Sequence, residues 1–284
     1  MKINLNLKHP SFYQGFTLVE MAIVLVIMGV MLGGLVVSLS AQMDIRNYNE
    51  TKQKIATIKE GLLGFVVSNR RLPCPDTDGD GVENLAAPLI VNDVPAAPQS
   101  TQTFACTNLE GLLPFQTLDA DRMDSWSNQF SYRVAPAFST RAIVWSANGA
   151  TGNIVGDTYF TLSSSGNITV QTRGDNPATA GITEGKFISN LTSNAAAVII
   201  SHGKNGFGAT SYTGVPMAAV PAVDVDETLN VTAGTTKLSR LIATGSGACS
   251  DTVEGSSFCE FDDVVDWLPM HLIFNRMVTA GQLP

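Results

Sequence analysis

The chain has 284 residues, with 17 basic and 25 acidic side chains and a formal net charge of −8. This length is enough for one large domain or two small ones in addition to a long helix. The acidic balance argues against a nucleic-acid-binding body, because phosphate contacts need clustered Lys and Arg. Only 15% of the residues are charged, and Thr, Ser, Ala, Asn and Gly are abundant. This composition suits a β-rich extracytoplasmic domain better than a cytosolic α/β enzyme.

The first expected element is an apolar helix that follows a basic leader, residues 1–15. From Leu18 to Val37 there are twenty residues in which Glu20 is the only charged side chain. At ~1.5 Å per residue, such a helix spans the ~30 Å hydrocarbon core of a bilayer. Because a carboxylate inside a membrane is costly, Glu20 needs a partner. The cheapest partner is the free amine of Phe16, which a cut after Gly15 would create.

The sequence Gly15-Phe16-Thr17-Leu18-Val19-Glu20 closely resembles the cleavage-and-methylation signal of type IV pilins and type II secretion pseudopilins. The resemblance implies that a prepilin peptidase/N-methyltransferase cuts between Gly15 and Phe16 and methylates the new amine. It also implies that Glu20, fifth after the cut, neutralises a Phe16 amine on a neighbouring subunit as a filament is built. Val37 stands where many true pilins have a helix-kinking proline, which leaves pilus versus pseudopilus open.

Two other interpretations of the N-terminus remain open. A secretory signal peptide would be cut after Ser38-Leu39-Ser40, but the apolar run is longer than the usual ~7–15 residues and contains Glu20. A single-pass anchor without processing would leave Gly15 and Glu20 unexplained. In any anchored form, Lys2 and Lys8 keep the N-terminus in the cytoplasm. The expected location is therefore the inner membrane with a periplasmic head, followed by the filament.

The helix is expected to continue past the membrane, because apolar residues recur at helical spacing on one stripe: Ile45, Tyr48, Ile55, Ile58, Leu62 and Phe65. The helix is expected to end before Pro73, because proline lacks the N–H that a helix needs. The predicted organisation is a cleaved leader (1–15), a long helix (16–69) and a β-rich head (70–284). The helix is predicted to be transmembrane over about 17–38 and amphipathic thereafter. A break at Gly33-Gly34 is the alternative, since glycine weakens a helix interior.

The head is expected to be loop-rich over residues 73–127 and rich in strands after that. The predicted strands are runs of β-favouring residues between turn signals: Gln129–Val134, Arg141–Trp145, Tyr159–Leu162, Ile168–Thr172, Ala195–Ser201 and Phe258–Leu268. Met270–Ala280 has the spacing of a short terminal helix. The predicted fold class is therefore α+β, a long N-terminal helix with an antiparallel-sheet head. This plan resembles that of minor pilins and pseudopilins.

All four cysteines follow the apolar segment: Cys74, Cys106, Cys249 and Cys259. On the oxidising side of a membrane, an even number of cysteines predicts two disulfides. Chain order favours Cys74–Cys106 and Cys249–Cys259, although four cysteines allow three connectivities. A zinc site is a poorer interpretation, because no Cys-x-x-Cys pair exists and His202 and His271 lack ligand spacing.

The best metal candidate is a run of alternating carboxylates with a glycine in the sixth position: Asp76, Asp78, Asp80 and Gly81. It matches the first half of an EF-hand-type Ca²⁺ loop. The twelfth position, which needs a bidentate Glu, is Ala87, so Glu83, Asp119 or Asp121 would have to substitute. Calcium sites in head loops are known among pseudopilins, so the resemblance makes Ca²⁺ the one cofactor to expect. The alternative is a solvated acidic turn.

The sequence gives little support for catalysis. It contains no Gly-x-Ser-x-Gly elbow, no His-Glu-x-x-His pair and no phosphate-binding loop. His202 could serve as a base, but Ser201-His202-Gly203 is better interpreted as a strand end followed by a tight turn. Asp262 and Asp263 are expected to be surface or strand-end acids, with a salt bridge to a neighbouring subunit as the alternative.

The predicted function is a structural subunit, a minor pilin or pseudopilin of a type IV pilus or type II secretion pseudopilus, and not an enzyme. Its expected partners are the prepilin peptidase, other pilin or pseudopilin subunits, an inner-membrane assembly platform and the membrane itself. The alternative is an adhesin or DNA-uptake pilin whose head binds a ligand at the filament tip. Nucleic acid is not expected as a partner, because the mature chain would be still more acidic.

Overall fold

The computed structural model of the chain describes Gly15 and residues 17–86, 89–91, 99–146, 154–174, 186–243 and 248–283. For residues 32–41, 89–91, 99–100, 146 and 155 it describes the backbone alone. The chain divides into two compact units, Met1–Arg46 and Asn47–Pro284. Helix α1, Leu18–Asn69, contributes to both units, and its backbone is helical at Gly33 and Gly34. The predicted alternative of a break at these two glycines is therefore wrong.

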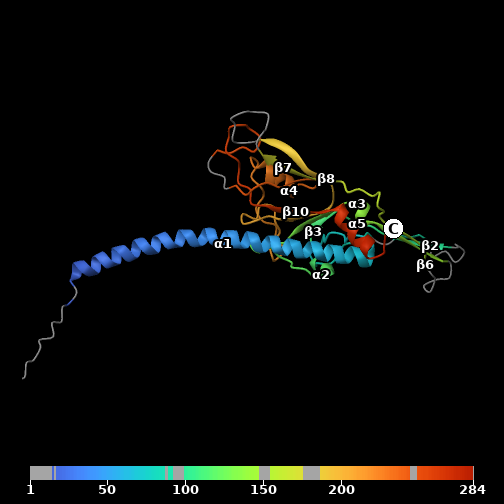
Figure 1. Cartoon of the computed structure of the whole chain (residues 1–284), viewed down its shortest axis with the longest axis horizontal. Helices are drawn as coiled ribbons and strands as arrows, with labels where there is room; N and C mark the ends of the chain where they lie inside the picture. Colours follow the sequence, from blue (N-terminus) through green and yellow to red (C-terminus); the bar gives the residue numbers. More distant parts are fainter. Residues whose placement is uncertain are drawn as a thin grey trace, which may run out of the picture. The chain divides into compact units, whose positions relative to one another are not determined.

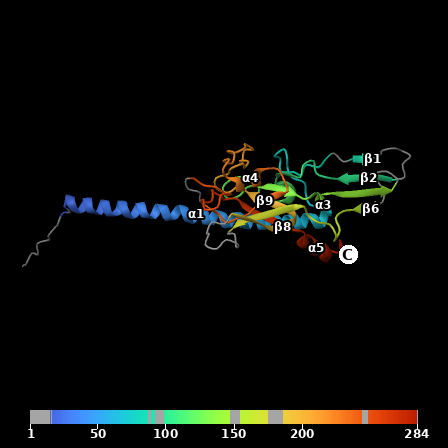
Figure 2. The same cartoon turned by 90° about the horizontal axis from the view of Figure 1, so that it is seen from above.

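The described elements that follow α1 are, in chain order: β1 (Leu89–Val91), β2 (Gln99–Phe104), β3 (Glu110–Leu112), α2 (Phe115–Leu118), β4 (Ser131–Val134), α3 (Pro136–Ser139), β5 (Arg141–Ser146), β6 (Ile154–Thr158), β7 (Ile168–Gly174), β8 (Phe187–Ser201), α4 (Val225–Val231), β9 (Thr236–Leu238), β10 (Val264–Pro269) and α5 (Met270–Thr279). Figure 1 and Figure 2 show these elements along the chain.

Within the described residues, the strands form a four-stranded sheet, β1-β2-β5-β6, and a six-stranded sheet, β3-β4-β8-β7-β9 with β10 added to β8. The second half of β8 lies between β4 and β10, so that Ile199 is opposite Tyr132 on one side and Asp266 on the other. Its first half pairs with β7, and β7 pairs in parallel with β9. An N-terminal helix followed by mainly antiparallel sheets confirms the predicted α+β, pilin-like fold class.

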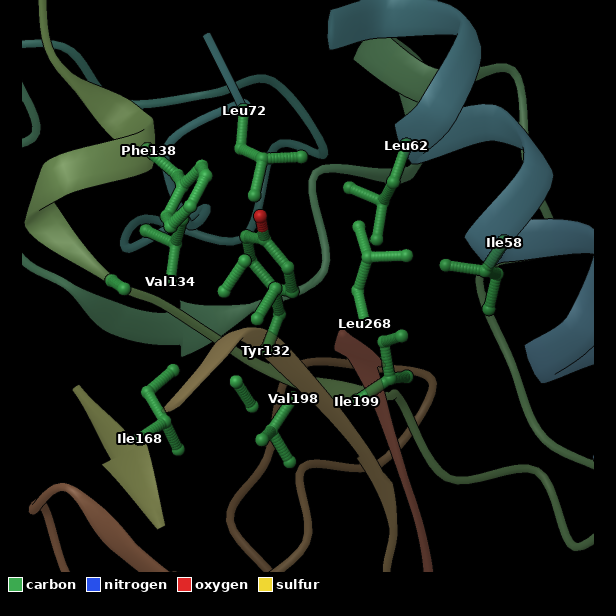
Figure 3. Packing of buried hydrophobic residues seen from close by; sticks show 14 of the residues in the cluster. Ile58, Leu62, Leu72, Tyr132, Val134, Phe138, Ile168, Val198, Ile199 and Leu268 are labelled. Atoms are coloured by element: carbon green, nitrogen blue, oxygen red, sulfur yellow. The ribbon is translucent and has the colours of Figure 1, made fainter. Parts of the chain in front are cut away.

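The core of the second unit lies between one face of α1 and the six-stranded sheet. The buried apolar residues of α1 recur at intervals of three, four and one, which places them on one face: Ile55, Ile58, Leu62, Leu63 and Val66. Figure 3 shows Ile58 and Leu62 facing Ile199 and Leu268 of the sheet. The predicted stripe is thus confirmed at Ile55, Ile58 and Leu62. Ile45 is 63% exposed, so the buried stripe begins after it.

Several predicted strands need correction. Tyr159–Leu162 is not a strand, because β6 ends at Thr158 and the Phe160 ring packs instead against Phe138 at 5.1 Å between centroids. β8 begins at Phe187 rather than Ala195; the added residues are mostly exposed, and their apolar members Phe187, Ile188 and Leu191 do not alternate regularly with polar ones. β10 begins at Val264 rather than Phe258. The region predicted to be loop-rich also contains β1, β2, β3 and α2.

All four cysteines lie within the described residues and form disulfides. Cys74 is joined to Cys106, 32 residues later, and Cys249 to Cys259, 10 residues later. This is the pairing that chain order favoured. Because both thiols of each pair are oxidised, none of these cysteines is a zinc ligand.

Leu62→Ala is expected to lower the free energy of unfolding by roughly 2–5 kcal/mol, because it removes a fully buried side chain and leaves a cavity. Denaturant unfolding of the purified chain measures this. Val278→Ala is the control: Val278 is 45% exposed on α5, so its loss is expected to change stability by less than about 0.5 kcal/mol. Equal effects of the two substitutions would contradict the assignment of the core.

Candidate functional site

The start of α1 holds Glu20 in a reciprocal contact with Thr17. The backbone N–H and the hydroxyl of Thr17 both donate to Glu20 Oε2 at 2.9 Å, and the Glu20 N–H donates to Thr17 Oγ1 at 3.2 Å. This is a capping box, in which a Thr and a Glu three residues later satisfy free N–H groups at a helix start. Glu20 therefore has a local partner in the single chain. This contact was not predicted above, although the Thr-x-x-Glu spacing is its sequence signal.

The proposed cleavage site lies immediately before this capping box. Gly15 is exposed, and a Cβ atom built there would meet nothing within 4 Å. Phe16 and residues 1–14, including the predicted position of the new amine, lie outside the described residues. The structure therefore places Gly15, Thr17 and Glu20 in open surroundings that a peptidase or a neighbouring chain can reach.

The first turns of α1 expose apolar side chains. Between Leu18 and Met31, the large apolar residues range from 43% exposed at Val24 to 88% at Leu18. An apolar surface of this kind is typical of a segment that meets lipid or another protein. Among the described residues, no helix has both the length and the hydropathy of a membrane span. The predicted transmembrane stretch, 17–38, extends into residues 32–41, whose side chains lie outside that description.

The structure brings Asp76, Asp78 and Asp80 together, with one oxygen of each within 4.8 Å of the others. Asp76 is buried, and its carboxylate accepts the N–H groups of Asp78 at 3.1 Å and of Gly79 and Gly81 at 2.7 Å. Asp76 thus fixes the turn of this loop through backbone contacts. Ca²⁺ binding by the loop stays a prediction.

Glu83, named above as a substitute ligand, forms an ion pair with Arg71 and is not part of the group around Asp76. Its two oxygens accept hydrogen bonds from the Arg71 guanidinium at 2.6 and 2.7 Å, and Oε2 also accepts the Cys74 N–H at 2.9 Å. The group around Asp76 includes neither Asp119 nor Asp121. Ala87 lies outside the described residues.

A second acidic group lies inside the head. Glu227 on α4 and Asp262 and Asp263 before β10 each place one oxygen within 4.8 Å of the other two. Their exposed fractions are 1%, 8% and 5%. The expectation that Asp262 and Asp263 are surface or strand-end acids is therefore confirmed for the strand end, since β10 begins at Val264, and is wrong for the surface. Local donors hold them inside: the Asn205 N–H donates to Asp262 Oδ2 at 2.7 Å, and Asn230 Nδ2 donates to Asp263 Oδ2 at 2.7 Å.

His202, at the end of β8, lies beside this group and is 1% exposed. Its Nε2 atom is 2.9 Å from Ser131 Oγ, and its Nδ1 atom is 3.5 Å from Asp263 Oδ1. Ser131, His202 and Asp263 follow the order of groups in a Ser-His-Asp hydrolase. However, 3.5 Å is longer than the hydrogen bond that orients the imidazole in such enzymes. The contact is therefore not a formed catalytic triad.

Burial and neighbouring carboxylates raise pKa values in this acidic group. Burial, followed by the charges of Asp263 and Asp224, raises the pKa of Glu227 to about 9. Burial is also the main cause that raises the pKa of Asp262 to about 6. Both shifts mean that the ionised carboxylates are unfavourable here without a compensating positive charge.

Gly203→Ala is expected to lower the free energy of unfolding by roughly 2–5 kcal/mol. Gly203 has a φ of +56°, and a Cβ atom there would lie 2.4 Å from the carbonyl oxygen and Oδ1 of Asp262. Gly214→Ala is the matched control, because its φ is +81° but nothing lies within 4 Å of its Cβ position. Thermal unfolding of both variants measures the difference. Equal losses would contradict the close approach of Gly203 to Asp262.

An open cleft of about 820 Å³ lies next to the buried acids. Its lining includes Ser131, His202 and Asn230, which contact the acidic group or its histidine, and also Asp76 and Arg122. Glu227, Asp262 and Asp263 do not line the cleft themselves; His202 and Asn230, each 1% exposed, lie between it and Asp263.

Comparison with known families gives one match, the prokaryotic N-terminal methylation motif, at residues 11–36. The matched residues include Gly15, Phe16 and Glu20. Comparisons with curated proteins and with solved structures found no match. The matched motif is typical of type IV pilin-like proteins and points to a structural protein.

Proposed function

We propose that the protein is a minor pilin or pseudopilin, a structural subunit of a type IV pilus or type II secretion pseudopilus. The observation that carries this proposal is the N-terminal methylation motif at residues 11–36. This motif implies processing by a prepilin peptidase and assembly with other pilins. The two disulfides suit an extracytoplasmic head, since such bonds persist in oxidising compartments.

In this proposal, the precursor is anchored in the inner membrane through the apolar start of α1, with its head in the periplasm. After cleavage, an assembly platform brings the subunits together, and packing between apolar helices replaces contacts with lipid. The exposed side chains from Leu18 to Met31 provide this packing surface. The filament then holds the subunit through its helix, while the disulfide-bonded head faces outward.

Glu20 sets the register of neighbouring subunits in this filament. Its carboxylate pairs with the methylated Phe16 amine of an adjacent chain, because an unpaired charge in an apolar core is unfavourable. The capping box contributes by holding the carboxylate at the first turn of α1, on the Thr17 side. Thr17 therefore positions Glu20 before the intermolecular pair forms.

One observation favours a second candidate function, a head that binds a ligand at the filament tip. The cleft of about 820 Å³ is large enough for a small molecule or a short segment of a larger one. Its acidic lining, which includes Asp76, Asp78 and Glu110, disfavours DNA. Pull-down of the full chain with DNA and with surface glycans separates this function from a purely structural one.

Fractionation of cells with and without the prepilin peptidase tests the proposed function. With the peptidase, we expect the leader-free chain in the filaments that shearing releases or in the pseudopilus fraction. Without it, we expect the full-length chain to stay in the membrane fraction. A full-length chain within filaments, or a shortened chain in cells that lack the peptidase, would contradict the proposal.

A further inference from the structure

We propose that Glu227, Asp262 and Asp263, with His202 beside them, bind a divalent cation inside the head. This site is separate from the predicted Ca²⁺ loop at Asp76 and does not depend on the proposed filament function. Three features support it: the convergence of the carboxylates, two buried polar atoms without hydrogen-bond partners, and the neighbouring cleft.

The three carboxylates converge from different parts of the chain. One oxygen each from Glu227, Asp262 and Asp263 lies within 4.8 Å of the other two, and all three residues are buried. The Asp262 N–H donates to Glu227 Oε1 at 3.1 Å, which ties the two segments together. Divalent ions such as Ca²⁺ and Mn²⁺ are commonly held by carboxylates in this way. The convergence therefore supplies the oxygen donors of a cation site.

Two buried atoms at this group lack a hydrogen-bond partner in the described part of the chain: Asp262 Oδ1 and His202 Nδ1. Buried polar atoms are rarely left without a hydrogen-bond partner. Where one is, a bound ion or water is one explanation. His202 Nδ1 points to the group, since it is 3.5 Å from Asp263 Oδ1. If Nε2 donates its proton to Ser131 Oγ, at 2.9 Å, then Nδ1 carries a lone pair. A cation held by the three carboxylates would give Asp262 Oδ1 a partner and would lie on the side of Asp263 that His202 faces.

Two basic side chains close to the group pair with acids outside it. Lys237 forms an ion pair with Glu110, and Arg240 forms ion pairs with Asp226 and Asp251. Lys237 and Arg240 therefore contact acids outside the group, although the charge of Lys237 also acts on Asp263. A divalent cation is the simplest additional source of positive charge for three buried carboxylates.

The cleft lies on the other side of two residues that contact Asp263. His202 and Asn230 both line it, and both also approach Asp263, at 3.5 Å from Nδ1 and 2.7 Å from Nδ2. An ion bound by Glu227, Asp262 and Asp263, next to His202, would join α4, the end of β8 and the segment before β10. Because these segments are distant in the sequence, binding would stabilise the folded head by linking them.

The nature of the donors limits the choice of ion. Carboxylates suit Ca²⁺ and Mn²⁺, whereas an added imidazole nitrogen favours Mn²⁺ or Zn²⁺. The test therefore uses the full chain in detergent, freed of metal with EDTA and then given Ca²⁺, Mn²⁺ or Zn²⁺ separately. Bound metal is counted by mass spectrometry, and thermal unfolding is followed in parallel. We expect about one ion per chain and a higher unfolding midpoint with at least one of the three ions.

Asp262→Asn and Asp263→Asn are expected to abolish both the bound ion and the rise in midpoint, at nearly constant side-chain volume. Asp78→Asn is the matched control, because it removes a charge from the exposed acidic loop and should leave the ion in place. If either buried variant fails to fold, metal binding by the wild type and by Asp78→Asn still tests the proposal. The proposal is wrong if the EDTA-treated wild type binds none of the three ions, or if Asp78→Asn loses an ion that Asp263→Asn retains.

Discussion

Glu20→Gln is expected to leave cleavage of the leader intact and to reduce incorporation into filaments by roughly 100-fold or more, because loss of one partner from a buried ion pair has an effect of this order. In the proposed filament, the neutral amide would leave the Phe16 ammonium of the next subunit unpaired. The amount of the chain in sheared filaments, relative to the amount of processed chain in the membrane, measures the effect.

Glu20→Gln is more informative than Glu20→Ala because of the capping box. A glutamine at this position can still accept the hydrogen bonds that Thr17 donates, so the helix start is preserved while the charge is lost. Thr17→Val is the complementary control, since it removes the hydroxyl contact and keeps the carboxylate. We expect Thr17→Val to assemble far better than Glu20→Gln. Normal incorporation of Glu20→Gln would remove the basis for the intermolecular pair.

Gly15→Leu is expected to slow removal of the leader by about 100-fold or more, because a small misplacement of the scissile bond has an effect of that size on an enzyme-catalysed step. The effect would arise in the peptidase site and not in the chain, since a Cβ atom at Gly15 meets nothing within 4 Å. The uncleaved precursor should therefore accumulate in the membrane fraction. Pulse labelling followed by gel separation of precursor and mature chain gives the rate.

Gly29→Leu is the control for this prediction. Gly29 also lies within the matched motif and also has open space around its Cβ position, but it follows the proposed cut. We expect it to be processed at the normal rate. A mature-length product from Gly15→Leu, in normal yield, would show that the peptidase does not read this glycine.

The elements that the sequence predicted correctly are those with a strong local pattern. The apolar spacing of Ile55, Ile58 and Leu62 identified the face of α1 that the sheet covers. The compact apolar run Ala195–Ser201 identified the C-terminal half of β8. By contrast, β2 (Gln99–Phe104) is almost entirely polar, so its strand conformation depends on pairing with β5 and is not visible in the pattern.

The two acidic groups also differ in whether a local sequence pattern could reveal them. Asp76, Asp78 and Asp80 are neighbours in the sequence, so their convergence could be predicted from a loop pattern. Glu227 meets Asp262 and Asp263 only through the tertiary fold. The one local signal was the position of the Asp pair between Phe261 and Val264, both of which are buried. Burial of charges at that place depends on the donors Asn205 and Asn230, which no spacing rule connects to it.

The N-terminus of the native protein tests the central claim most directly. N-terminal sequencing together with the intact mass of the purified protein gives both the first residue and its modification. We expect a chain that begins at a methylated Phe16, with residues 1–15 absent. A chain that begins at Met1, or downstream of Ser40, would contradict it, because the amine that is proposed to pair with Glu20 would then not exist.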